Sequence, residues 1–158
     1  MGRVSLFAPS CCVPAGFAPF GIQDIGGQVY VSFASTSGGT GGYIDIFSES
    51  GTLVKQLVHS PQFNQPWGFA IAPSNFGPLS NALLISENTS AGTILGFNPT
   101  TGKFLGQLKN SLGKPIAIPG LWGIQFGGGT SANGQTNQLF FTAGPSDTDG
   151  YFGLIYFK

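Results

Sequence analysis

The apolar and polar positions of this chain follow one pattern that recurs three times. Each copy begins with an anchor made of an aromatic residue, a glycine and an apolar residue, at 20–22, 67–69 and 122–124. A run of mostly apolar residues follows each anchor, at 29–33, 82–86 and 139–142. Continuous apolar runs of this length predict strands that are covered on both faces.

Two further signals complete the repeat. A Gly-x-Ile-x-x-Phe pattern occurs at 42–47 and 92–97, and a weaker Phe-x-Leu-x-x-Phe occurs at 152–157. Loosely alternating segments at 52–58 and 103–108 predict half-buried outer strands. A repeat of roughly 50 residues built from four short strands is the signature of propeller blades. The expected fold class is therefore all-β, a β-propeller with three four-stranded blades per chain.

The repeat also predicts a domain organisation. We expect a single unit over 1–158, with an outer strand and linker at 1–13 and blades at 14–64, 65–119 and 120–158. The third blade lacks an outer strand, whereas segment 3–8 has the length and pattern of one. Because an unpaired strand edge is a template for pairing, we expect segment 3–8 of one chain to complete the third blade of another.

Blade number bears on the oligomeric state. Propellers typically have about 4 to 8 blades, so three are too few to close a ring. Two chains supply six, and closed symmetry is usual for soluble homo-oligomers. The prediction is a six-bladed, strand-swapped homodimer. A fragment of a longer propeller and a nine-bladed trimer are the alternatives.

Charge narrows the range of partners. Charged residues make up only 8% of the chain and the formal net charge is zero, which removes the electrostatic basis for binding nucleic acid or an anionic membrane. The sequence contains no run of about 18 apolar residues, so it predicts no membrane-spanning helix. The first residues lack the pattern of a signal peptide. Low charge with abundant Ser, Thr, Asn, Gln and Gly favours an extracellular or periplasmic location.

Four segments carry a resemblance to a known family. They are PWGFAIAP at 66–73, GTI at 92–94, FNPTTGKFLG at 97–106 and GLWG at 120–123. They resemble an uncharacterised family of exported bacterial six-bladed β-propellers, which is related more loosely to NHL-repeat proteins. The resemblance extends over about 14–157 and implies that this chain is about half the usual length of a member. It brings no established activity and no catalytic residues.

The three anchors are expected to lie at one end of the innermost strands, beside the loops at 35–42, 87–92 and 144–150. Aromatic rings at this channel face can stack on a carbohydrate or another small molecule, and neighbouring amides can hydrogen-bond to it. The candidate ligand-binding residues are Phe20, Gln23, Gln65, Trp67, Asn88, Trp122 and Gln125. They predict a non-enzymatic binding module. The alternative for the tryptophans is packing between blades.

Acidic residues on the same face suggest a second class of function. Glu87 ends a predicted strand, and Asp147 and Asp149 alternate in the corresponding loop of the third copy, before Gly150. Carboxylate oxygens of this kind can bind calcium, although Asp and Gly are also common in solvated turns. A calcium site would fit a hydrolase of the lactonase or esterase type. A structural or assembly protein without a ligand is the third possibility, and the fold alone does not choose among them.

The remaining reactive residues predict no catalytic group. His59 follows a predicted outer strand and is expected at the surface, and the chain has no G-x-S-x-G nucleophile elbow. The glycine-rich segment 38–42 lacks the lysine of a phosphate-binding loop. Cys11 and Cys12 are adjacent, which leaves open two free thiols, an interchain bond or a strained vicinal disulfide.

Overall fold

The computed structural model describes residues 13–146 and 149–157, and it is all-β, with three antiparallel sheets of three or four strands. The first sheet contains β1 (Phe17–Ile25), β2 (Gln28–Ser35), β3 (Gly42–Ser48) and β4 (Leu53–Ser60) in that order. The second sheet contains β5 (Pro66–Ile71), β6 (Leu83–Glu87), β7 (Ile94–Phe97) and β8 (Phe104–Gln107). The third contains β9 (Leu121–Phe126), β10 (Leu139–Ala143) and β11 (Tyr151–Ile155). A single 3-10 turn, Gly77–Leu79, precedes β6.

Each sheet is a meander, because strands that are consecutive in sequence are neighbours in the sheet. The turn between β1 and β2 is the tightest connection and consists of Gly26 and Gly27, both with positive φ. Two-residue hairpin turns of this kind match the twist of the strands and need residues that tolerate positive φ. Local chain connectivity therefore accounts for every strand pairing in the three sheets.

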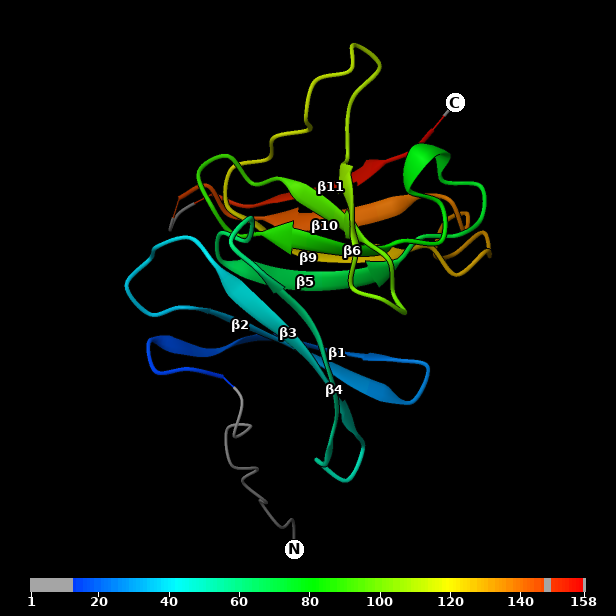
Figure 1. Ribbon diagram of the computed structural model, residues 1–158. Helices are drawn as coiled ribbons and strands as arrows, with labels where there is room; N and C mark the ends of the chain where they lie inside the picture. Colours follow the sequence, from blue (N-terminus) through cyan, green and yellow to red (C-terminus); the bar gives the residue numbers. More distant parts are fainter. Residues whose placement is uncertain (1–12, 147–148, 158) are drawn as a thin grey trace, which may run out of the picture.

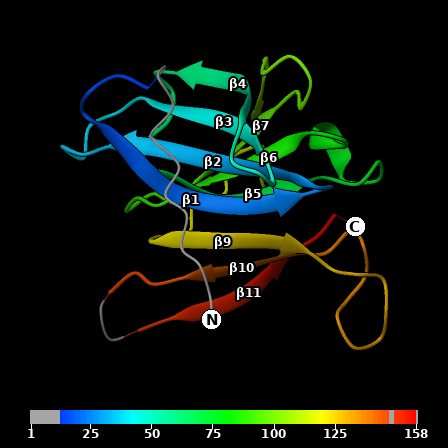
Figure 2. The same cartoon turned by 90° about the horizontal axis from the view of Figure 1, so that it is seen from below.

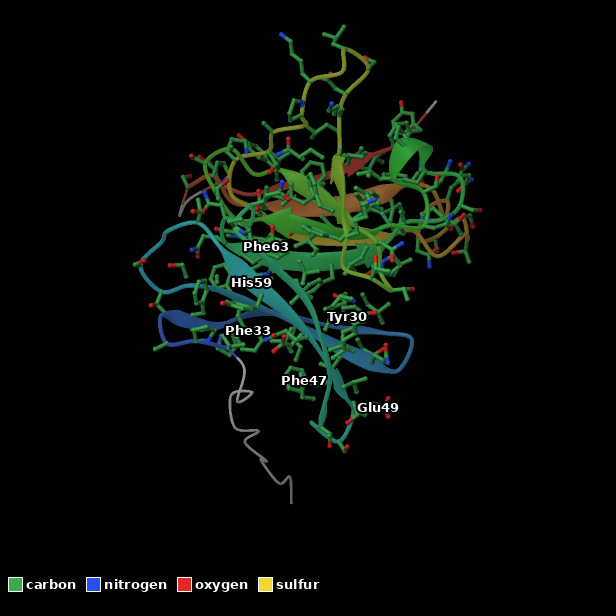
Figure 3. All side chains as sticks on the ribbon, viewed as in Figure 1. Tyr30, Phe33, Phe47, Glu49, His59 and Phe63 are labelled. Carbon is green, nitrogen blue, oxygen red and sulfur yellow. The ribbon has the colours of Figure 1, made fainter. Side chains whose placement is uncertain are left out.

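The second sheet packs against the first sheet on one face and against the third sheet on the other (Figure 1). One core cluster joins the first and second sheets and includes Tyr30, Ile44 and Phe69. The other joins the second and third sheets and includes Leu84, Leu121 and Leu139. Phe63 and Tyr30 belong to the first cluster, whereas Phe47 and Glu49 lie on the side of the first sheet that is remote from the second (Figure 3).

The predicted strands agree with the structure, with one informative difference. The runs at 82–86 and 139–142 correspond to β6 and β10, and β6 and β7 are buried along their whole length, as strands covered on both faces should be. In contrast, β10 is buried mainly at Leu139 and Ala143. The described residues place no sheet against the far side of β10, so that side remains open.

The anchor glycines lie where neighbouring sheets approach each other. Gly68 and Gly123 each come two residues after the first residue of their strand, whereas β1 starts four residues before Gly21 and continues through an irregular register between Pro19 and Gly21. A Cβ on Gly21 would collide with the carbonyl oxygen of Trp67, and one on Gly68 would lie 2.7 Å from that of Trp122. Glycine is required because the backbone of the next sheet approaches at this point.

Candidate functional site

The anchor aromatics occupy two different environments. The rings of Phe20 and Trp67 pack edge to face, with their centroids 4.4 Å apart, and Trp67 is half-buried. Trp122 is 42% exposed, and its ring covers the backbone of Gly144 so closely that a Cβ there would collide with it. Trp67 therefore serves as packing between the first two sheets, while Trp122 keeps a large part of its indole open to solvent.

A hydroxyl side chain that recurs in all three sheets holds each anchor, and it was not among the predicted site residues. Ser32 Oγ accepts a hydrogen bond from the amide of Gly21 at 2.9 Å, and Ser86 Oγ accepts one from Gly68 at 2.8 Å. In the third sheet, Thr142 Oγ1 accepts the corresponding bond from Gly123 at 3.3 Å. A signal was present in the sequence, since a hydroxyl residue occupies the fourth position of 29–33, 83–87 and 139–143.

Ser86 also links two sheets. Its hydroxyl, which accepts from the amide of Gly68, donates to the carbonyl of Trp122 at 2.5 Å. This buried side chain fixes the anchor of its own sheet and that of the next one with a single oxygen atom. The backbone of Trp122, on β9, is therefore held by the second sheet as well as by its own sheet.

Gln65 and Asn88 lie together beside the Trp67 anchor. The amide of Asn88 donates to the carbonyl of Gln65 at 2.8 Å, and Gln65 has the positive φ of 56°. The side-chain Nε2 of Gln65 donates to the carbonyl of Ser35 at 3.1 Å. The side chain of Gln65 is thus engaged with the loop of the first sheet, and its role in the structure is to hold that loop.

Glu87 is a buried carboxylate with two hydrogen bonds. Oε1 accepts from the amide of Asn64 at 2.7 Å, and Oε2 accepts from the hydroxyl of Thr93 at 2.7 Å. Burial raises the pKa of Glu87, and both hydrogen bonds oppose that increase because they favour the charged form. The carboxylate ties the turn before β5 to the loop before β7, so both oxygens have structural partners.

The predicted calcium ligands are only partly within the described residues. Asp147 lies outside them, while Asp149 is exposed and accepts a hydrogen bond from the hydroxyl of Ser146 at 3.2 Å. The part of the chain that the structure describes contains no group of three or more His, Cys, Asp or Glu residues that could hold a metal ion. Calcium binding stays a prediction, as does the state of Cys11 and Cys12, which also lie outside the described residues.

Gln23 and Gln125 form the third part of the predicted site. Each lies two residues after an anchor glycine, and Nε2 of Gln23 donates to Oε1 of Gln125 at 3.5 Å. Ala70 occupies the same position in the second sheet and is buried in the core between the second and third sheets. A hollow of about 250 Å³ lies beside them; its lining includes Gln23, Gln125, Phe140, Thr142 and Phe152.

The predicted binding residues therefore do not form one constellation. Phe20 pairs with Trp67, Gln65 with Asn88, and Gln23 with Gln125. His59 lies on the outermost strand of the first sheet, stacked on Tyr43 with ring centroids 4.3 Å apart. None of the helical segments described is long and apolar enough to cross a membrane.

The chain is similar to three proteins of Acanthamoeba polyphaga mimivirus, and no family model matches it. It is 31% identical to uncharacterized protein R648 over 153 residues, which cover 90% of this chain and 36% of that protein. It is 33% identical to uncharacterized protein R640 over 121 residues, which cover 71% of the chain and 22% of R640. A match to uncharacterized protein L690, 26% identical over 153 residues, covers 90% of the chain and 39% of L690. The chain thus spans well under half the length of these relatives, and their names assign no activity.

Proposed function

We propose that the three sheets are consecutive blades of a β-propeller and that the protein is a non-enzymatic binding module for a carbohydrate or another small neutral molecule. Two copies of the chain supply six blades, as the sequence predicts. The support for the blade assignment is the repeated contact between sheets. The anchor glycine of one sheet meets the anchor carbonyl of the next, first at Gly21 and Trp67 and again at Gly68 and Trp122.

The exposed indole of Trp122 is the observation that carries the binding proposal. Its counterpart Trp67 packs against Phe20, whereas Trp122 is 42% exposed although its backbone is held by Ser86. A ring that is fixed in position but open on one side offers a preorganised stacking surface. Sugars present apolar C–H faces to such rings, and their hydroxyls bond to nearby amides.

Gln23 and Gln125 supply amides of the required kind. Gln125 lies three residues after Trp122 on β9, which corresponds to about 10 Å along a strand. Their mutual hydrogen bond is long at 3.5 Å and is exposed, so a ligand hydroxyl can replace it at little cost. With few charged residues in the chain, neutral ligands fit better than ionic ones. An extracellular or periplasmic location belongs to the same proposal.

Intrinsic tryptophan fluorescence tests the proposal, because the chain has only two tryptophans. We expect titration with a panel of neutral mono- and disaccharides to change the emission of the wild type and of Trp67→Phe. The Trp122→Ala variant should lose this response while keeping its melting temperature close to that of the wild type. Trp67→Ala is the matched control for packing and should lower the melting temperature. A panel that gives no response with the wild type, or an unchanged response with Trp122→Ala, would contradict the proposal.

A further inference from the structure

We propose that the open face of the third sheet binds the open face of the first sheet in a second copy of this chain. The inference rests on the proposed repeat of the sheets as blades. We call the first of these surfaces the tail face, which consists of Phe140, Thr142, Phe152 and Leu154, and the second the head face, which includes Ile22, Val29 and Val31. Strand register places each set on the side of its sheet that is remote from the second sheet.

Equivalent positions of the three anchors show that the head face is half of an interface. Ile22, Phe69 and Ile124 each follow an anchor glycine and pair with the corresponding residue of the second strand. Phe69 is 1% exposed and Ile124 is 3% exposed, because each packs against the preceding sheet. Ile22 has no preceding sheet among the described residues and is 74% exposed. The head face therefore presents an apolar side chain where both internal interfaces bury one.

The tail face shows the complementary half. Ile44, Ile94 and Phe152 pair with the hydroxyl residues Ser32, Ser86 and Thr142. Ile44 and Ile94 are fully buried against the following sheet, but Phe152 is 76% exposed.

The same holds one pair further along the sheet. Tyr30 and Leu84 are buried, while their counterpart Phe140 is only partly covered and stacks on Phe152 with ring centroids 5.7 Å apart. The two rings form an apolar surface of the kind that the first two sheets bury on this side.

The tail face also carries a hydroxyl group, that of Thr142, at the position of Ser86 in the second sheet. The Ser86 hydroxyl accepts a hydrogen bond from the amide of Gly68 and donates one to the carbonyl of Trp122 in the next sheet. The Thr142 hydroxyl accepts a hydrogen bond from the amide of Gly123. A Cβ placed on Gly123 would have the Thr142 hydroxyl, 3.4 Å away, as its only near neighbour among the described residues. The carbonyl that crowds Gly21 and Gly68 has no counterpart there among the described residues. The residue that fits is Phe20 of a second copy, since Phe20 is the remaining anchor aromatic.

The second copy is the partner that satisfies both faces at once. Head and tail differ from one another, so the contact is heterologous, and such contacts form closed rings when the rotation between copies allows it. Two chains joined head to tail and tail to head have two such contacts and six sheets. The tail face contains no charged residue, so its partner needs no opposite charge to bind it. A further sheet within a longer chain would present the same kind of surface as the head face. The two partners are distinguished by the oligomeric state of this chain, because only docking to a second copy makes it a dimer.

Sedimentation equilibrium of the full chain, from micromolar to millimolar concentration, tests the inference. The expected mass is about twice the chain mass of 16.4 kDa. Ile22→Asp and Phe152→Asp should each give a folded protein of single-chain mass, because both side chains are exposed in the isolated chain. Leu112→Asp is the matched control, since Leu112 is 79% exposed but lies in a loop outside both faces, and it should remain dimeric. Circular dichroism establishes that each variant is folded.

Mixing the two variants gives a sharper test. Ile22→Asp keeps its tail face and Phe152→Asp keeps its head face, so an equimolar mixture should form a one-to-one dimer through the single intact contact. A single-chain mass for the wild type, dimers of both Asp variants, or no association in the mixture would overturn the inference. The saccharide titration is independent of this outcome: a dimer that binds no saccharide refutes the proposed ligand alone, and a monomer that binds one refutes the docking alone.

Discussion

At the anchors, one side chain with two hydrogen-bond partners links two sheets. The Ser86 hydroxyl connects the amide of Gly68 to the carbonyl of Trp122 across a sheet boundary. Thr142 has the same position in the third sheet but a more exposed environment and a longer bond of 3.3 Å. A hydrogen bond contributes more to the free energy of unfolding when its loss leaves buried groups unsatisfied. Ser86 should therefore contribute more to stability than Thr142.

Ser86→Ala should therefore be more damaging than Thr142→Ala. The first substitution leaves a buried amide and a carbonyl without their partner, and we expect a loss of about 1–3 kcal/mol in the free energy of unfolding. The second removes one exposed bond, and we expect about 0.5–1 kcal/mol. Urea denaturation of both variants measures the difference. Equal losses would show that the bond across the sheet boundary adds nothing to stability.

Glu87 gives the protein a specific pH dependence. Because burial raises its pKa in the folded state, the folded protein holds the proton more tightly than the unfolded chain. The contribution of Glu87 to stability is therefore full below its unfolded pKa and is lost as the pH rises through its raised folded pKa.

Glu87→Gln removes this loss, because the amide oxygen can still accept from Asn64 and the NH2 group can donate to the Thr93 hydroxyl. The melting temperature of Glu87→Gln should rise relative to that of the wild type as the pH increases from about 4 to about 7. Exposed Glu49→Gln controls for the removal of one negative charge. A difference between wild type and Glu87→Gln that is constant over this range would contradict the assignment.

At the level of elements, the sequence predicted the strands well because their signals are local. Continuous apolar runs identify β6 and β10, and the Gly-x-Ile pattern identifies β3 and β7. The environments of Trp67 and Trp122 were not predictable, because they depend on which sheet lies next to each anchor. That information lies in the contacts between one sheet and the next rather than in the sequence of a single repeat.

The free edge of β11 is the element with the strongest expected effect on association. It is the edge strand of the third sheet, and a hollow of about 570 Å³ runs beside it, lined by 109–111, Ile116 and 154–157. The sequence-based prediction pairs segment 3–8 of another chain with this edge; that segment lies outside the described residues. An extended strand would use the backbone groups of β11 that pair with no other described strand.

Deletion of 1–9 should accordingly abolish the dimer or cause aggregation through β11, rather than cause a mild loss of stability. Light scattering of the truncated protein measures both outcomes. A truncated chain that stays dimeric and soluble would show that segment 3–8 takes no part in the assembly, and the docking of head and tail faces would then stand alone.

In the whole molecule, the first and third sheets expose the proposed head and tail faces at opposite ends. Ile22 and Phe152 are exposed at positions where Phe69 and Ile44 are buried. Figure 2 shows the consequence, with the first and third sheets at opposite sides of the view and no described sheet beyond either.

The most direct measurement is a crystal structure of the chain together with its symmetry-related copies. The account predicts a ring in which Ile22 is buried to the level of Phe69 and Ile124, against Phe140 and Phe152 of a neighbouring copy, with the Phe20 carbonyl within hydrogen-bonding distance of the Thr142 hydroxyl. A structure in which the head and tail faces meet solvent or unrelated surfaces in every copy would contradict it.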